Sequence, residues 1–342
     1  MRVCILTGGG DCPGLNAVIR AVVRKGERHY GDEVLGSLDG YRGLIEGETV
    51  TLDVESMRGT LPRGGTVLGT SRIQPYAVEG GVDMVRRTLH TLGIDAIIAV
   101  GGEGTLSCAH ELARDGLPIV GVPKTIDNDI GGTELTFGFD TAVQIAVEAI
   151  DRLHTTAESH DRVIVVEVMG RHVGHIAAWA GMAAGATMTL IPEEPFDIAA
   201  VCQSLVRRHE RGRFASIVVV AEGALPRDGT MVIPEKVYDQ YGHVRLGGIG
   251  AIVAGEIEQR TGFETRVTTL GHVQRGGTPT AFDRVLSTRF GLAAIDAVHE
   301  HAWGQMVALR SGEMVRVPLT DAIANLKVVD PRLWDDAGQF FA

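Results

Sequence analysis

Two polar loops, each placed directly after a run of apolar residues, constrain the fold of this chain most strongly. Residues 95–100 and 117–122 are apolar runs with the length and composition of buried parallel strands. The first is followed by Gly-Gly-Glu-Gly-Thr at 101–105, and the second by Pro-Lys-Thr-Ile-Asp-Asn-Asp at 123–129. In open α/β sheets, ligands bind outside the carboxyl ends of the strands. We therefore expect the two loops to share a binding site.

The residue types in these loops suit phosphate chemistry. Glycines let the main chain approach a phosphate closely, and the amides in the first turn of a following helix stay free to bind it. Glu103 could hold Mg²⁺, and Asp127 could take a proton from a hydroxyl group. Phosphoryl transfer needs such a set, because its catalysis is mostly positioning and neutralisation of charge. The loops therefore indicate a phosphoryl-transfer site.

Apolar runs and helical stretches alternate along the rest of the chain. This alternation predicts an α/β fold with mainly parallel, doubly wound sheets in two lobes. Residues 223–248 show no clear period and are expected at the surface. Further strands are expected at residues 3–6, 33–38, 162–168, 187–191, 215–221, 265–270 and 305–309. Helices are expected at residues 15–28, 81–92, 139–157, after 171 to about 184, 197–210, 249–261, after 277 to about 299, and 320–326.

The composition restricts the partners and the compartment of the chain. A formal net charge of −11 argues against nucleic acid or an anionic membrane surface as the main partner. No apolar run approaches the roughly 18 residues of a membrane span, and the N-terminus lacks the features of a secretory signal. Cys4, Cys12, Cys108 and Cys202 show no paired metal-binding spacing and are interpreted as reduced thiols. We expect a soluble, cytoplasmic protein.

The glycine-rich turn at residues 7–14 does not have the features of a dinucleotide site. It follows a strand and precedes a helix, as in many nucleotide-binding folds. Its pattern is not G-x-G-x-x-G, and no acidic residue ends a second strand at the sequence spacing of a dinucleotide-binding motif. NAD binding is therefore disfavoured.

Six short motifs stand out along the chain. They are TGGGDCPGLN at residues 7–16, RGGT at 63–66, GGEGT at 101–105, PKTIDND at 123–129, VMGR at 168–171 and GHVQRGG at 271–277. In this order, and over almost the whole chain, they resemble the 6-phosphofructokinase family. The resemblance implies transfer of a phosphoryl group from a nucleotide, or from pyrophosphate, to the 1-hydroxyl of fructose 6-phosphate. It also implies Mg²⁺, allosteric regulation, and a homotetramer or dimer with shared active sites.

The resemblance implies two Rossmann-like lobes of three layers each. Residues 1–140 with about 274–325 would bind the nucleotide, residues 141–273 would bind the sugar phosphate, and residues 326–342 would form a C-terminal tail. Glu103 stands where most family members carry aspartate, and either carboxylate can hold Mg²⁺ directly or through water. Arg72 resembles the arginine that bridges the donor phosphates; a surface arginine without a role is the alternative. The donor contacts implied are Gly10, Ser71, Arg72, Ile73, Gly102, Glu103, Gly104 and Thr105.

Asp127 matches the general base of the family. A carboxylate in a polar loop can remove a proton from a sugar hydroxyl while that hydroxyl attacks a phosphate. By the same resemblance, Thr125 offers a hydroxyl and an amide to the transferred group, and Asp129 tunes Asp127 or orients the loop. The alternatives are a helix cap or Asx turn for Asp127, and a purely structural role for Asp129.

A set of arginines resembles the sugar-phosphate pocket of the family, because guanidinium groups pair bidentately with phosphate. Arg162 and Arg171 are also implied in catalysis, and Glu222 should meet sugar hydroxyls. In the family, the counterparts of Arg162 and Arg266 come from a neighbouring subunit, so a monomer would have an incomplete pocket. The substrate contacts implied are Thr125, Ile126, Asp127, Arg162, Met169, Gly170, Arg171, Glu222, Arg266, His272, Val273, Gln274 and Arg275.

The identity of the phosphoryl donor depends on residues 104 and 124. Family members that use pyrophosphate resemble this chain at Lys124 but carry aspartate at the position of Gly104, and those that use ATP commonly have glycine at both. An aspartate at 104 would fill the space of the nucleotide α-phosphate and repel it, at a cost of roughly 4 kcal/mol for charges about 4 Å apart. Gly104 therefore predicts ATP, with pyrophosphate as the alternative.

Regulation is also suggested by the resemblance. Arg20, Arg24, Arg211 and Arg213 match arginines of a bacterial effector pocket for ADP or phosphoenolpyruvate, although a solvated helix face is an equal alternative for the first two. His154 and Thr187 replace an arginine and an acid of that pocket. These replacements disfavour ADP activation and leave inhibition by phosphoenolpyruvate open.

Two other functions compete with this interpretation. A nicotinamide-nucleotide or lipid kinase would explain the loop at 101–105, but neither the arginine set nor the motif at 123–129. A non-catalytic sugar-phosphate sensor would be expected to lose its base or its metal ligand, and Asp127 and Glu103 are both present.

Overall fold

The computed structural model describes residues 1–231 and 247–341. The chain divides into two compact units, one formed by Met1–Thr141 with Arg275–Lys327, the other by Ala142–Gln274 with Val328–Ala342. The residues from 328 onward, which we expected in a separate tail, group with the second unit.

The first unit contains one sheet of seven described strands in the order β11-β10-β5-β4-β1-β2-β3. The central strands run parallel, and only the two edge strands, β3 and β11, pair antiparallel with their neighbours. This arrangement confirms the predicted mainly parallel sheet. The strands are β1 (Arg2–Thr7), β2 (Glu33–Ser37), β3 (Thr49–Leu52), β4 (Ala96–Gly101), β5 (Ile119–Pro123), β10 (Gln305–Arg310) and β11 (Glu313–Pro318).

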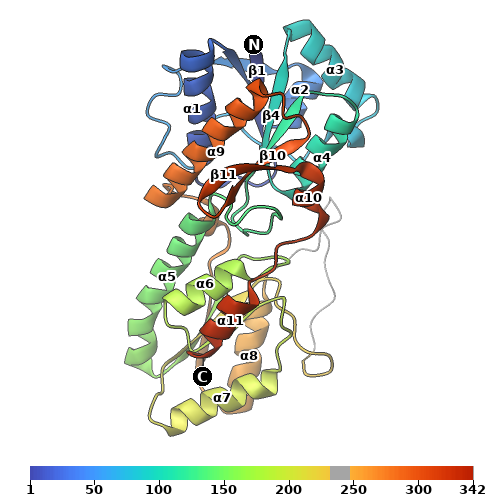
Figure 1. Cartoon of the computed structure of the whole chain (residues 1–342). Coiled ribbons are helices and arrows are strands. Elements are labelled where there is room, and N and C mark those ends of the chain that lie inside the picture. Colours follow the sequence, from blue (N-terminus) through green and yellow to red (C-terminus); the bar gives the residue numbers. More distant parts are fainter. Residues whose placement is uncertain (232–246, 342) are drawn as a thin grey trace. The chain divides into compact units, whose positions relative to one another are not determined.

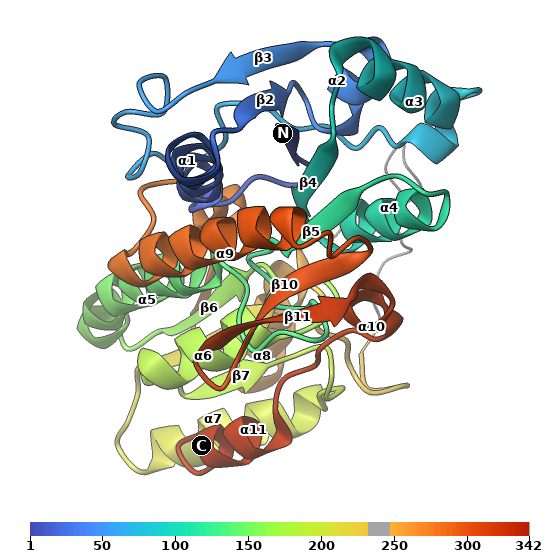
Figure 2. The same ribbon diagram turned by 45° about the horizontal axis from the view of Figure 1, so that its top comes forward.

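Helices cover both faces of this sheet, as Figures 1 and 2 show. On one face α1 packs against α9. On the other face, four helices bury their apolar side chains against residues of β1, β4, β5 and β10, which builds the main core of the unit. The helices are α1 (Leu15–Lys25) and α9 (Ala281–His299) on the first face, and α2 (Tyr41–Glu46), α3 (Gly81–Leu92), α4 (Glu103–Arg114) and α10 (Leu319–Ala324) on the second.

The second unit contains a sheet of four described strands, all parallel, in the order β7-β8-β6-β9. Helices α7 and α8 form its core with β6 and β8, while α6 packs on β7 and β8 and contacts α11. Helix α5 begins in the first unit and continues into the second. The elements are β6 (Val163–Val168), β7 (Met188–Leu190), β8 (Ser216–Ala221), β9 (Thr265–Thr269), α5 (Phe139–His160), α6 (His175–Ala183), α7 (Ile198–Glu210), α8 (Ile249–Thr261) and α11 (Pro331–Gly338).

Most predicted elements are present with ends shifted by a few residues. The predicted helix 15–28 ends at Lys25 and continues as a π-helical turn, Gly26–Tyr30. Of the predicted surface segment 223–248, residues 232–246 lie outside the described residues. Cys4, Cys12, Cys108 and Cys202 are all buried. Among the described residues, no helix combines the length and apolarity needed to cross a membrane.

Candidate active site

Three loops of the first unit follow the adjacent strands β1, β4 and β5, so they meet at the carboxyl edge of the sheet. They carry Gly8–Gly10, Gly101–Gly104 and Lys124–Asp129. Main-chain hydrogen bonds join them: the Gly8 amide donates to the Val100 carbonyl (2.9 Å), and the Lys124 amide donates to the Gly101 carbonyl (3.0 Å). The two loops that the sequence predicted to share a site are therefore adjacent, with the first glycine loop beside them.

Thr105 explains why two of these loops need glycine. A Cβ atom on Gly8 would lie 2.6 Å from the Thr105 hydroxyl, and one on Gly101 would lie 2.4 Å from it. Thr105 itself is buried, and its carbonyl accepts a hydrogen bond from the Tyr41 hydroxyl (3.0 Å). The side chain of Thr105 packs beneath the loops and sets their spacing, and its contact with the donor stays a prediction.

The start of α4 has the properties of a phosphate-binding helix terminus. Gly102 occupies the N-cap position without a side-chain cap, so the amides of the first turn remain available to a ligand. Glu103 is exposed and accepts a hydrogen bond from the Ser107 hydroxyl (3.1 Å). The Gln74 side-chain amide donates to the Gly104 carbonyl (3.0 Å), and a Cβ atom on Gly104 would lie 3.3 Å from that nitrogen.

The segment that carries the other predicted donor contacts lies beside the first glycine loop. The Gly9 amide donates to the Ser71 carbonyl (3.3 Å), and the Ser71 hydroxyl donates to the Asp39 carbonyl (2.6 Å). Arg72 and Ile73 follow and are both exposed. The predicted donor residues are therefore close in the first unit, except that Thr105 is covered.

Two cations surround Gly10. Lys124 is buried (4% exposed), and its Nζ donates to the Gly10 carbonyl (2.5 Å). The Arg275 guanidinium would lie 3.0 Å from a Cβ atom on Gly10. Burial lowers the pKa of Lys124, and the positive charge of Arg275 lowers this pKa further. The carboxylates of Asp129 and Asp127 raise it. The site thus combines two cations and two carboxylates beside glycine-rich main chain.

Hydrogen bonds of Thr125 fix the loop around Asp127. The Asp127 amide donates to the Thr125 hydroxyl (3.1 Å), and the Thr136 hydroxyl donates to the Thr125 carbonyl (2.7 Å). Asn128 has a left-handed main chain, with φ of 54°. Asp127 is half-buried, with Oδ1 shielded from solvent. A carboxylate on a loop fixed in this way can accept a proton from a substrate hydroxyl, which is the role predicted for Asp127.

The donor set suits a magnesium ion that arrives with phosphate. Among residues 1–231 and 247–341, no group of three or more His, Cys, Asp or Glu side chains is arranged to hold a metal ion alone. Mg²⁺ keeps several waters and is commonly bound by one or two carboxylates together with substrate phosphates. Glu103, exposed beside the first turn of α4, can supply such a carboxylate.

In the second unit, a group of predicted sugar-phosphate residues follows the carboxyl ends of β6, β8 and β9. Gln274 connects two of these loops: its side chain is fully buried, accepts from the Met169 amide (3.3 Å) and donates to the Gly271 carbonyl (3.0 Å). Gln274 thus holds these loops together, and its contact with the substrate stays a prediction. The residues at this edge are Met169, Gly170, Arg171, Glu222, His272 and Val273.

Arg162 and Arg266 lie at the opposite edge of that sheet. Arg162 precedes β6 and Arg266 is the second residue of β9, whereas Arg171 follows the end of β6. Six residues of strand span roughly 16 Å. Arg162 pairs with Glu264 (2.7 Å), and Arg266 pairs with the same carboxylate. One chain therefore does not bring these two arginines together with Arg171.

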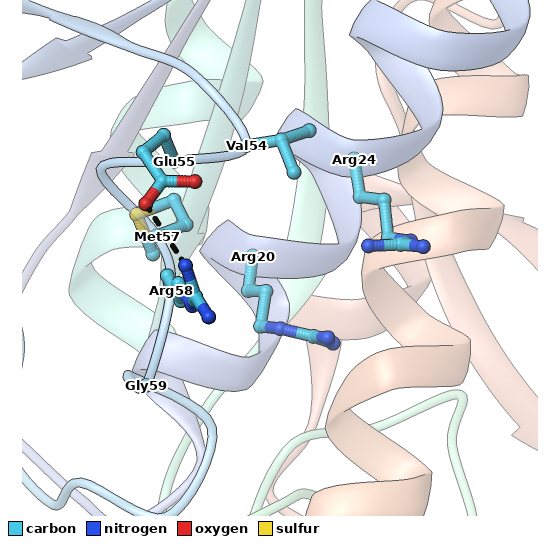
Figure 3. A pocket seen from close by; sticks show the side chains of 7 residues that line it. All are labelled: Arg20, Arg24, Val54, Glu55, Met57, Arg58 and Gly59. Carbon is cyan, nitrogen blue, oxygen red and sulfur yellow. Dashed lines mark hydrogen bonds and ion pairs between the residues drawn. The ribbon is translucent and has the colours of Figure 1, made fainter.

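The arginines of the predicted effector pocket line two cavities. Figure 3 shows Arg20 and Arg24 projecting from α1 beside residues 54–59, where Arg58 pairs with Glu55 (3.3 Å); the cavity measures about 260 Å³. Among the described residues, Arg20 and Arg24 form no ion pair. In the second unit, a cavity of about 410 Å³ is lined by Ser204, Arg207, Arg208, Arg211, Arg213 and Phe340.

The two residues that differ from the family's effector pocket are engaged elsewhere. His154 Nε2 bonds to the Ala184 carbonyl (2.7 Å), and the Thr187 hydroxyl accepts from the Ile217 amide (3.2 Å). Both side chains therefore hydrogen-bond to main chain of the second unit.

Several residues near the site were not predicted. Gln74, Asn128, Glu264 and Lys327 all contact predicted site residues or their loops. None stands in a pattern that indicates its partner, because the contacts join segments remote in sequence. Lys327 and Asn128, for example, are 199 positions apart.

Glycine loops between strands and helices, two cations and two carboxylates at one sheet edge define a phosphotransferase. A sequence model of the family named phosphofructokinase matches residues 2–298. The chain belongs to the phosphofructokinase family, as the motifs predicted.

Relatives and a solved structure agree with this assignment. The chain is 60% identical over 342 residues to a pyrophosphate–fructose 6-phosphate 1-phosphotransferase of Streptomyces coelicolor, with both chains covered completely. It is 55% identical over 342 residues to an ATP-dependent 6-phosphofructokinase of Mycobacterium tuberculosis, again with complete coverage. The T-state phosphofructokinase of Pichia pastoris matches with a TM-score of 0.85 and 33% identity, over 99% of this chain and 36% of the yeast chain. The predicted fold is therefore confirmed, while the relatives differ in their phosphoryl donor.

Proposed function

We propose that the chain is an ATP-dependent 6-phosphofructokinase of cytoplasmic glycolysis. It would use Mg²⁺ and transfer the γ-phosphoryl group of ATP to the 1-hydroxyl of fructose 6-phosphate. The main support is Gly104, which presents only main chain in the first turn of α4, where a carboxylate would oppose a nucleotide phosphate.

In this reaction Asp127 accepts the proton of the 1-hydroxyl as its oxygen attacks the γ-phosphorus. The bond to the bridging oxygen breaks, and ADP leaves with that oxygen. Lys124 and Arg275, which both lie close to Gly10, offset the charge that builds on the transferred group. When bound, Mg²⁺ supplies further positive charge at the donor phosphates, with Glu103 as the residue that would hold it.

A pyrophosphate-dependent enzyme is the second candidate. Lys124 favours it, because its buried ammonium group is able to neutralise a small inorganic donor, and the Streptomyces coelicolor relative carries that name. A nicotinamide-nucleotide or lipid kinase is disfavoured by the family match over most of the chain.

Assays of the purified chain with fructose 6-phosphate separate these candidates. We expect kcat/KM with ATP and Mg²⁺ to exceed that with pyrophosphate and Mg²⁺. The reverse order would assign the second candidate, and turnover with neither donor would exclude both.

Subunit sharing is a separate part of the proposal, and it follows from the position of Arg162. Because Arg162 and Arg266 lie at the sheet edge remote from Arg171, we propose that a second copy supplies them to each pocket in a homotetramer.

Chains with Arg162→Ala and chains with Asp127→Asn should each be nearly inactive. In mixed oligomers of the two variants, about a quarter of the active sites should be restored. A complete site takes Asp127 from an Arg162→Ala chain and Arg162 from an Asp127→Asn chain. Co-expression with two purification tags tests this, and no recovery in verified mixed oligomers would contradict shared sites.

Regulation by an anion is proposed for the cavity between α1 and residues 54–59 (Figure 3). We expect phosphoenolpyruvate to raise the concentration of fructose 6-phosphate needed for half-maximal rate. Arg20→Ala together with Arg24→Ala should weaken phosphoenolpyruvate at least about tenfold, because hydrogen bonds to charged groups contribute about 1.5–3 kcal/mol. The rate without phosphoenolpyruvate should not change. A double variant with the unaltered response would exclude this cavity as the effector site.

A further inference from the structure

Lys327 donates hydrogen bonds into the loop that carries Asp127 and Asp129. Its Nζ lies 2.7 Å from Asn128 Oδ1, 2.8 Å from the Glu134 carbonyl oxygen and 3.1 Å from the Thr133 carbonyl oxygen. Its own amide donates to the Asp129 carbonyl (3.0 Å). The residue is the last of the first unit and lies three positions after α10.

Asn128, the first of these partners, stands between the two carboxylate residues. Its side-chain oxygen also accepts from the Thr136 amide (3.0 Å), which closes the loop on itself. Its φ of 54° is unusual for a residue other than glycine, although asparagine tolerates it. The Lys327 ammonium group therefore stabilises the side-chain carbonyl of Asn128. Asn128 in turn fixes the direction of the main chain immediately after Asp127.

Other contacts hold the far end of the loop independently of Lys327. The Gly131 amide donates to the Ala322 carbonyl of α10 (3.1 Å), and the Arg310 side chain of β10 donates to the Gly132 carbonyl (2.9 Å). The Glu134 amide donates to the Leu309 carbonyl (2.9 Å). Loss of the Lys327 side chain should therefore disturb the part next to Asp127 more than the fold of the unit.

The charge of Lys327 depends on pH. Burial lowers its pKa to about 8, while the carboxylates of Asp129 and Glu134 oppose this shift. Both carboxylates belong to the same loop, and the side chain of Arg310, the last residue of β10, donates a hydrogen bond to that loop as well. As pH rises through this range, Lys327 loses its proton and becomes a weaker donor to Asn128.

We propose that Lys327 is a positioning residue for phosphoryl transfer, which acts through Asn128 and the main chain of Asp129 to hold Asp127 where it can accept the proton. The inference rests on the proposed role of Asp127 as the base. It applies whichever phosphoryl donor the enzyme uses, because the acceptor hydroxyl is the same.

Lys327→Met tests the proposal in the full-length protein. We expect kcat to fall about 10- to 100-fold, because misplaced catalytic groups lose rate steeply, while KM for both substrates changes less than threefold. The kcat of the unaltered chain should also decline as pH rises through about 8. This decline should be absent in Lys327→Met. In Lys327→Arg, whose guanidinium stays charged, the decline in kcat should move beyond pH 10.

Two further variants keep the test decisive. Lys25→Met removes a lysine of the same unit that pairs with Asp296 (2.5 Å), and its kcat and pH profile should match those of the unaltered chain. If Lys327→Met does not fold, Asn128→Gly keeps the left-handed main chain, removes the oxygen that accepts from Lys327, and should show the same selective loss of kcat.

The outcomes distinguish this proposal from the proposed function. Lack of turnover by the unaltered chain would count against the function itself. Normal turnover by the unaltered chain, with unchanged kcat and an unchanged alkaline decline in folded Lys327→Met, would overturn the positioning role alone.

Discussion

Replacing Asp127 by asparagine is expected to lower kcat by about 10²- to 10⁴-fold, the usual contribution of a general base. Asparagine preserves the shape of the side chain but cannot accept the proton of the sugar hydroxyl. The loop should keep its conformation, because hydrogen bonds made by Thr125, Asn128 and Thr136 hold its main chain. KM for fructose 6-phosphate should therefore change much less than kcat.

Steady-state kinetics and circular dichroism together check this result. Asp127→Ser, which shortens the side chain, should lose as much rate as Asp127→Asn. Asp129→Asn serves as the matched control, since it neutralises the neighbouring carboxylate in the same loop, and its loss should be smaller. Full turnover by folded Asp127→Ser would remove the basis of the proposed mechanism.

Gly104→Asp should lower kcat/KM for ATP by about 10²- to 10³-fold. The added carboxylate would lie in the first turn of α4, and two like charges about 4 Å apart repel by roughly 4 kcal/mol at an effective dielectric near 20. Solvent and Mg²⁺ reduce that figure, so it sets the upper end of the expected loss. Use of pyrophosphate should be retained, because that donor has no α-phosphate to be displaced.

Gly104→Ala separates charge from steric bulk. A Cβ atom at this position would lie 3.3 Å from the Gln74 side-chain nitrogen, the end of a side chain that can shift. We therefore expect the alanine variant to keep most of its activity with ATP. Equal losses in Gly104→Ala and Gly104→Asp would show that space, and not charge, decides the donor; no loss in Gly104→Asp would contradict the argument entirely.

The sequence predicted the strands and loops that carry the site because these segments have strong local patterns. Continuous apolar runs identified β4 and β5, and the polar motifs GGEGT and PKTIDND begin where these two strands end. The strands β3 and β11 were not predicted. Both are short edge strands with largely exposed or half-exposed side chains, so their apolar periodicity is weak.

The roles of side chains within the site were less predictable than their location. Thr105 and Gln274 belong to family motifs, but only the three-dimensional structure shows that both are buried and contact main chain. Arg162 and Arg266 belong to the same predicted set as Arg171. The resemblance implied that Arg162 and Arg266 come from a neighbouring subunit, and the bounds of β6 and β9 place both at the sheet edge remote from Arg171.

The Thr105 hydroxyl fills the space where side chains of both Gly8 and Gly101 would begin. Protein engineers who try to alter nucleotide preference by changing one of these positions will therefore perturb the other two. Productive redesign requires simultaneous replacement, with a smaller residue at 105 accompanying any larger one at 8 or 101.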